Sequence, residues 1–166
     1  MSVSPDLFKQ VLGRFCSGVT ILTFKNATGI HGLTVTAFSS LSLDPPLILC
    51  CIKKGGNSYD GLSGSEHFTV NILSDKQKDL ALRFANSELD SSARFAGCEY
   101  QTLKHGIPCF NDNLAHILCH KSKEYDGGDH AIFIGQVEEV HFSEAHRPLL
   151  YFSKKFHQVY PHVSNK

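Results

Sequence analysis

The sequence predicts one mainly β domain spanning residues 1–166, an antiparallel barrel with two or three peripheral helices. Three observations support this prediction. The 166 residues suit a single domain. Six or more short runs rich in Val, Ile, Thr and Phe are separated by turn residues, as strands are. These runs do not alternate with helices, which argues against a doubly wound parallel sheet.

The composition excludes several classes of protein. At 42% hydrophobic and 19% charged residues, the chain is an ordinary globular protein. Lys and Arg total 16 against 16 acidic residues, so no basic footprint for nucleic acid or an anionic membrane is expected. No apolar stretch approaches the roughly 20 residues of a membrane helix. The start, "MSVSPDLFKQ", does not resemble a secretory signal, so we expect a cytoplasmic protein.

The first expected element is a helix. Ser4 can cap its start, Pro5 suits the first helical position, and apolar residues then recur at helical spacing. These apolar residues are Phe8, Val11, Leu12 and Phe15. We expect this helix to pack on the outside of the sheet.

Four strands are expected next. The segment "NATG" (26–29) has the chemistry of a hairpin turn, because Asn and Gly tolerate a left-handed backbone, and "LDPP" (43–46) ends another strand. The expected strands span residues 18–25, 31–40, 46–53 and 67–73.

A second helix is expected in "SDKQKDLALRFAN" (74–86). Ser74 and Gln77 form a capping box at its start. Its buried stripe is expected to consist of Leu80, Ala81, Phe84 and Ala85. A loop of polar and Gly residues (86–113) follows, and the last expected strands span residues 114–125, 129–142 and 148–153.

The six cysteines, at positions 16, 50, 51, 98, 109 and 119, include no CxxC pair, so reduced thiols in the cytoplasm are the simplest interpretation. A zinc site is the alternative, because histidines and cysteines cluster in sequence at His105, Cys109, His116, Cys119 and His120. In the strand expected there, His116 and His120 share a face while Cys119 points to the other. We therefore expect no metal site.

Two stretches could bind a ligand. In "GLTVTAFSSLSLDPPLILCCI" (32–52), hydroxyl groups and backbone amides could bind a phosphate or a heteroaromatic ring edge; the alternative is a strand with one face in water. In "CIKKGGNSYDGL" (51–62), glycines allow close approach to an anion, and Asn57, Ser58 and two lysines offer donors. The alternative is a solvated loop, since the Walker order is missing.

A third stretch, "YDGGDH" (125–130), precedes an expected strand on which His130 shares a face with Ile132 and Ile134. Its residues fit a turn, a metal ligand or a substrate contact, and a lone histidine is most often structural. Asp129 has the alternative role of fixing the turn through its own backbone. The many serines lack a GxSxG elbow, so no nucleophile and base pair is expected.

Taken together, five stretches resemble the short-chain flavin reductases of the FMN-binding split-barrel type, which include the reductase components of two-component phenol and 4-hydroxyphenylacetate monooxygenases. The resemblance covers nearly the whole chain, in order. It rests on "FKQVLGRFCSGVTILT", "HGLTVTAFSSLSLDPPLILCCI", "FTVNILSDKQKDLALRFA", "GGDHAIFIGQV" and "PLLYFSKKFHQ".

The resemblance implies a split barrel that uses NADH or NADPH to reduce FAD or FMN, which then leaves to serve a separate oxygenase. It also implies a homodimer with flavin near the subunit interface. Hydride transfer between stacked rings requires no acid, base or nucleophile from the protein, so we expect no catalytic residue. The missing Rossmann GxGxxG agrees with a nucleotide held by another fold.

The resemblance also assigns site residues. The expected flavin contacts are Thr34, Val35, Thr36, Ala37, Phe38, Ser39, Ser40, Cys51, Ile52, Lys53, Asn57, Ser58, Phe84 and Ala85. The expected contacts of the nicotinamide nucleotide are Gly128, Asp129, His130, Tyr151 and Phe152. The sequence departs from many relatives at Cys50 and Cys51, where a small or β-branched residue is common.

Two other functions fit the same residues. One is a reductase that keeps its flavin bound and passes electrons to another acceptor, such as a cobalt corrinoid. The other is a non-catalytic flavin-binding or redox-sensing module in which the cysteines matter more. The rate of NAD(P)H consumption with varied free flavin separates the three.

Overall fold

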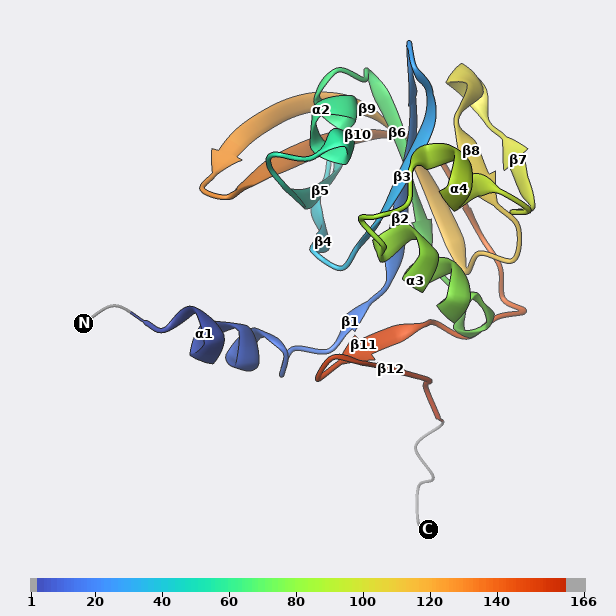
Figure 1. Cartoon of the computed structure of the whole chain (residues 1–166). Helices are drawn as coiled ribbons and strands as arrows, with labels where there is room; N and C mark the ends of the chain where they lie inside the picture. Colours follow the sequence, from blue (N-terminus) through green and yellow to red (C-terminus); the bar gives the residue numbers. More distant parts are fainter. Residues whose placement is uncertain (1–2, 161–166) are drawn as a thin grey trace.

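The computed structural model describes residues 3–160, and within them the main sheet has seven strands that pair antiparallel throughout (Figure 1). Their order is β3 (Gly29–Val35), β2 (Thr20–Asn26), β6 (His67–Ile72), β9 (Ala115–Gly127), β10 (His130–Phe142), β5 (Pro46–Lys53) and β4 (Phe38–Leu43). The outer part of the sheet curls back, since β3 also contacts β5. The predicted antiparallel barrel is confirmed.

Smaller elements surround this sheet. One small sheet joins β1 (Ser17–Gly18), β11 (Leu150–Phe152) and β12 (Lys155–His157), and another joins β7 (Tyr100–Thr102) and β8 (Pro108–Phe110). The α-helices are α1 (Pro5–Leu12), α2 (Asn57–Ser63), α3 (Lys78–Ala85) and α4 (Ser91–Phe95), and the 3-10 turns are η1 (Asp75–Gln77) and η2 (Lys104–Gly106). Within residues 3–160, no helix combines the length and the apolar character needed to cross a bilayer.

Alternation along the strands divides the core in two. In β2, Leu22 and Phe24 point into the barrel, where they pack with Phe133 and other buried residues. Ile21, the residue before Leu22, points outward and packs with Phe84 of α3 in a second core. Because successive side chains of a strand face opposite ways, β2 holds the barrel interior on one face and α3 on the other.

The expected single strand over residues 31–40 is wrong. The chain leaves β3 after Val35 and starts β4 at Phe38, which pairs with β5 at the opposite edge of the sheet. Thr36 and Ala37 make this crossing. The two expected turns are confirmed: Asn26 pairs with Gly29, which has φ 123°, and Leu43 pairs with Pro46.

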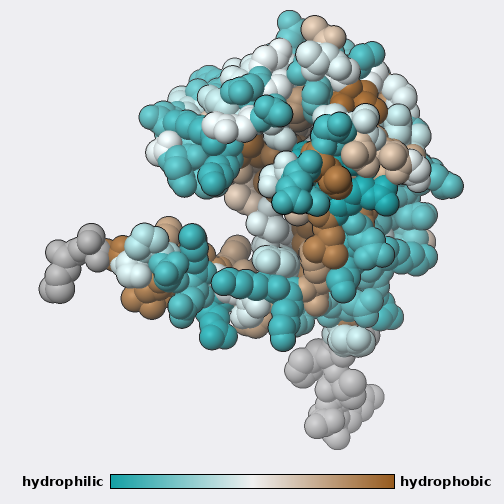
Figure 2. Space-filling model, in the orientation of Figure 1, coloured by the Kyte–Doolittle hydropathy of each residue, from teal (hydrophilic) through white to brown (hydrophobic). Residues whose placement is uncertain are grey.

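The first helix forms as predicted, and the Leu7 N–H donates to the Ser4 hydroxyl oxygen at 3.4 Å. Its expected packing on the sheet is wrong, because α1 extends away from the rest of the chain (Figure 1). Phe8 and Val11 keep 55% and 60% of their area exposed. Figure 2 shows hydrophobic residues on this isolated helix. The amphipathic pattern predicted the helix correctly, and within residues 3–160 its apolar face stays largely exposed.

The second helix also starts where predicted, since the Ser74 N–H donates to Gln77 Oε1 at 2.9 Å. Its first turn is η1 rather than α-helix. Ala81 and Phe84 are buried as expected, but Ala85 is exposed because it ends the helix. The expected loop 86–113 is wrong in part: it contains α4, β7, η2 and β8, elements too short to show a period.

The last predicted strands correspond to β9, β10 and β11, and each end lies within two residues of the expected position. Besides the four elements within 86–113, the sequence did not predict α2, which was expected to be a polar turn, or β12. All six cysteines are free thiols, as expected. Cys50 is fully buried in the barrel core, and burial raises the pKa of its thiol, so Cys50 serves packing.

Candidate functional site

A cleft of about 860 Å³ lies between the end of β5, the first turn of α2, the C-terminal end of α3 and α4. Seven of the expected flavin contacts line it, and they come from four separate segments of the chain. These are Thr34, Ile52, Lys53, Asn57, Ser58, Phe84 and Ala85. The fold therefore brings half of that expected set to one place.

Two contacts between β3 and α3 position one wall of this cleft. The Thr34 hydroxyl donates to the carbonyl oxygen of Ala81 at 2.7 Å. Gly32, two residues before Thr34 on the same face of the sheet, lies under the ring of Phe84. A Cβ on Gly32 would come within 2.6 Å of Phe84 Cε1. The absence of a side chain at Gly32 thus lets α3 approach the sheet and directs its last residues to the cleft.

The opposite wall is basic and rich in glycine. Lys53 ends β5, Gly55 has φ 77°, and Gly56 caps α2 without a side-chain hydrogen bond. The first backbone bond of α2 runs from the Tyr59 N–H to Gly56 O at 2.9 Å, so the N–H groups before it are open to a ligand. This combination of amides and positive charge suits a phosphate.

Two residues without a sequence prediction also line the cleft. His31 contacts Thr28 Oγ1 through Nε2 and Ser91 Oγ through Nδ1, both at 2.8 Å. Arg94 donates through Nη1 to Gly32 O at 2.8 Å. Burial, and then the charge of Arg94, lower the pKa of His31, so its ring is neutral at pH 7. His31 is the first residue of the second stretch that resembles the flavin reductases, but no sequence pattern indicated Arg94.

The three expected nucleotide contacts at 128–130 lie at the tip of the β9–β10 hairpin. This tip abuts the basic wall, since the Lys54 N–H donates to Asp129 O at 2.9 Å and His130 pairs with Lys53. Asp129 Oδ1 lies 2.7 Å from His130 Nδ1. Asp126 also fixes the turn, because its carboxylate accepts the Gly128 N–H at 3.0 Å, and the Asp129 carboxylate contacts its own backbone N–H, as the turn-fixing alternative requires.

The other expected flavin contacts, and the two expected nucleotide contacts on β11, do not line the cleft of the chain to which they belong. Val35 is buried in the barrel core, while Phe38 and Cys51 are half-buried. The exposed members are Thr36, Ala37, Ser39 and Ser40. Tyr151 and Phe152 belong to β11, beside β1, and are not brought together with the hairpin tip.

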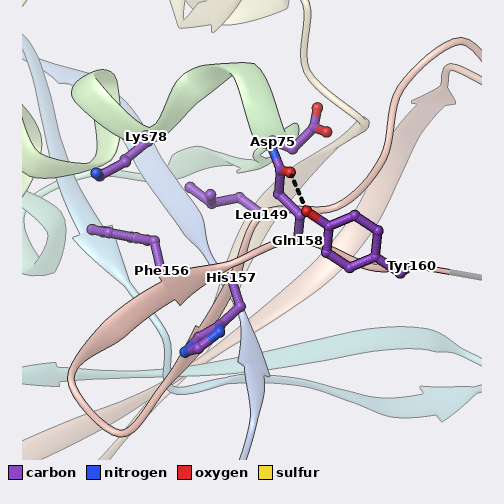
Figure 3. A pocket seen from close by; sticks show the side chains of 7 residues that line it. All are labelled: Asp75, Lys78, Leu149, Phe156, His157, Gln158 and Tyr160. Atoms are coloured by element: carbon purple, nitrogen blue, oxygen red, sulfur yellow. Dashed lines mark hydrogen bonds between the residues drawn. The ribbon is translucent and has the colours of Figure 1, made fainter.

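A second hollow, of about 470 Å³, lies beside β12 and α3. Figure 3 shows Gln158 and Tyr160 meeting at one end and Phe156 and Lys78 at the other. The Tyr160 hydroxyl donates to Gln158 Oε1 at 3.3 Å. The hollow shares no lining residue with the cleft, and it holds none of the expected contacts.

Comparison with known proteins agrees with the expected family. The model of the flavin reductase like domain matches residues 12–160. The reductase subunit HsaB of a flavin-dependent monooxygenase from Mycobacterium tuberculosis is 36% identical over 161 residues, which covers 96% of this chain and 84% of HsaB.

Solved structures agree as well. The flavin reductase PheA2 in its native state has a TM-score of 0.87 at 35% identity, covering 96% of this chain and 100% of PheA2. The NADH:FAD oxidoreductase SgcE6 of Streptomyces globisporus, in complex with NAD and FAD fragments, has a TM-score of 0.89 at 29% identity, covering 98% and 99%. The split-barrel fold and the resemblance seen in the sequence are therefore confirmed, and the chain belongs to the flavin reductase like domain family.

Proposed function

We propose that this protein is an NAD(P)H:flavin oxidoreductase that reduces FAD or FMN and supplies the reduced flavin to a separate monooxygenase. One observation carries the proposal: seven expected flavin contacts from four segments converge on one cleft. Relatives support it, since HsaB is the reductase subunit of a monooxygenase and SgcE6 is an NADH:FAD oxidoreductase.

The residues of the cleft fit such a ligand. Hydride transfer from nicotinamide C4 to flavin N5 is direct, so the chain has to hold two rings and need not supply an acid or base. Lys53 and the Gly55–Gly56 turn would hold the phosphate end of the flavin. Of residues 34–40, which were expected to donate to the ring system where negative charge arrives, only Thr34 lines this cleft, so the others would reach the flavin only if a second subunit brought them near.

The nucleotide contacts expected at Gly128, Asp129 and His130 are part of this proposal. Their hairpin tip is bonded to the basic wall through Lys54 and Asp129. A nucleotide held there would lie beside the flavin cleft, as hydride transfer requires. Tyr151 and Phe152 would take part only if a second subunit brought them near.

We also infer a homodimer, because α1 has an apolar face that nothing within residues 3–160 covers. Leu7, Phe8, Val11 and Leu12 each remain more than half exposed. An isolated helix of eight residues is not stable in water, so α1 needs a surface to pack on. A second copy would supply this surface. Val11→Glu should shift the mass measured by light scattering toward the monomer, whereas Gln10→Glu, on the opposite face, should not.

The cytoplasm fits this function. NAD(P)H is available there, and all six thiols are free, as expected in a reducing compartment.

A steady-state assay tests the function. NADH or NADPH consumption is followed while free FAD, FMN or riboflavin is varied. We expect a rate that rises with free flavin and saturates. A rate that does not respond to added flavin would favour a bound prosthetic flavin, and no consumption above background would favour a non-catalytic module.

A further inference from the structure

Helix α2 forms part of the basic wall of the cleft, yet its own sequence gives it little stability. Its seven residues, NSYDGLS, include Asn, Asp, two Ser and a Gly, all of which favour a helix less than Ala or Leu does. Its N-cap residue, Gly56, supplies no side-chain hydrogen bond. A helix this short is not stable alone in water, so contacts with the rest of the chain must hold α2 in place.

Glu124 of β9 makes two of these contacts. The hydroxyl of Tyr59 donates to Glu124 Oε1 at 2.9 Å, and the hydroxyl of Ser63 donates to Glu124 Oε2 at 2.8 Å. Tyr59 and Ser63 are four positions apart, so they lie on the same face of α2, one near its start and the other at its end. A single carboxylate therefore bonds to both ends of the helix.

An irregularity in β9 brings a second side chain to the same helix. In the ladder between β9 and β10, Lys121 and Lys123 pair with consecutive residues, so Ser122 is the extra residue of a bulge. Because of this bulge, Lys121 and Glu124 can share one face of the strand, which residues three apart in a regular strand do not. Lys121 Nζ donates to the carbonyl oxygens of the last two residues of α2. Two side chains of β9 thus bind one short helix.

The ring of Tyr59 connects these bonds with the barrel and with the cleft. Its centroid lies 6.1 Å from that of Phe133, a fully buried residue that pairs with Glu124 across the ladder. Figure 1 shows α2 beside the β9–β10 hairpin. Tyr59 lines the cleft, as do Asn57 and Ser58 of the same helix, whereas Glu124 does not. The Glu124 carboxylate therefore fixes the position of cleft residues without being one of them.

We propose that Glu124 is a positioning residue of the flavin site and acts through Tyr59 and Ser63. This inference rests on the proposed function, in which Lys53 and the loop before α2 hold the flavin phosphate. Charge alone gives the opposite expectation, because a carboxylate close to the cleft repels a phosphate and its removal should strengthen binding. Since Glu124 acts by holding α2, its removal should instead weaken the binding of flavins that carry a phosphate.

The test is the equilibrium binding of oxidised FMN and of riboflavin to the flavin-free full-length protein, measured by calorimetry. Glu124→Ala should raise the Kd for FMN by roughly tenfold, as expected for the loss of hydrogen bonds to a charged group, and the Kd for riboflavin by about twofold at most. Retained riboflavin binding shows that the variant is folded. Glu124→Gln keeps one acceptor oxygen, so its Kd for FMN should lie between those of Glu124→Ala and the wild type.

The control is Glu99→Ala, which removes the same charge from an exposed position that does not line the cleft and should bind both flavins as the wild type does. A second comparison uses the variant Tyr59→Phe/Ser63→Ala, which lacks both donors but keeps the ring. Adding Glu124→Ala to it should raise the Kd for FMN no further.

Three results would overturn the positioning role of Glu124. They are a further rise in that background, FMN binding by Glu124→Ala that is unchanged or tighter, and an equal loss of affinity for the two flavins. All of these are read from binding without turnover. They are therefore distinguishable from a failure of the proposed function, which the consumption of NAD(P)H reports.

Discussion

His130 lies directly opposite Lys53 in the antiparallel ladder between β10 and β5. The pairing places the tip of the β9–β10 hairpin against the basic wall of the cleft. A hydrogen bond of 2.9 Å from the Lys54 N–H to Asp129 O closes this junction. The residues expected to hold the nucleotide and those expected to hold the flavin phosphate are thus adjacent through the backbone, although more than 70 positions separate them in sequence.

His130→Ala should raise the apparent KM for the nicotinamide nucleotide by roughly tenfold, equivalent to about 1.4 kcal/mol, with a smaller effect on the KM for flavin. The reason is that the ring stands at the hairpin tip, 42% exposed and oriented by Asp129. Steady-state kinetics with each substrate varied in turn measures both constants. Equal effects on the two, or none, would remove His130 from the nucleotide site.

Lys53→Gln should raise the KM for FMN by roughly tenfold, as expected for loss of one charge-assisted contact to phosphate, and should change the KM for riboflavin little. Riboflavin lacks the phosphate, so the comparison isolates that contact. Lys123→Gln, on β9 and not lining the cleft, is the matched control. If Lys53→Gln affected both flavins alike, Lys53 would not be a phosphate ligand.

Gly32→Ala should destabilise the protein by about 1–3 kcal/mol, because the new methyl group would overlap the ring of Phe84 at 2.6 Å. Displacing Phe84 should also weaken flavin binding. Gly18→Ala is the control: nothing lies within 4 Å of its added methyl group, so the change should stay within about 0.5 kcal/mol. Chemical denaturation measures both. Equal stability of the two variants would show that α3 can shift without cost.

The free energy of unfolding should rise with pH through the window below about 6.5, the unfolded pKa of histidine. Burial lowers the pKa of His31 in the folded state, so in this window the unfolded chain binds more protons. His31→Asn should make the rise shallower, while His67 and His116, whose pKa values burial also lowers, keep part of it. Denaturation curves at several pH values test this, and an unchanged slope would contradict it.

Local patterns predicted the local structure well. The Ser74–Gln77 capping box, the Asn26–Gly29 hairpin and the cap at Ser4 each depend on residues only three positions apart. Such motifs satisfy backbone groups within one turn, so neighbouring residues determine them. The glycine and lysine loop of the cleft could be identified for the same reason.

Features that depend on distant partners could not be read from the sequence. The crossing at Thr36 and Ala37 carries no glycine or proline, and the break arises because β3 and β4 pair with different strands. Arg94 enters the cleft from a five-residue helix with no period to detect. The apolar face of α1 was visible in the sequence, but the position of this helix away from the sheet was not.

The most direct test of the central claim is an anaerobic reaction in which free FAD or FMN greatly exceeds the protein and NAD(P)H is added. Reduction is followed by the loss of the visible absorbance of oxidised flavin. The account predicts that each chain reduces many molecules of flavin, because reduced flavin leaves the cleft and oxidised flavin replaces it. Reduction of no more than one flavin per chain, or at the rate seen without protein, would contradict it.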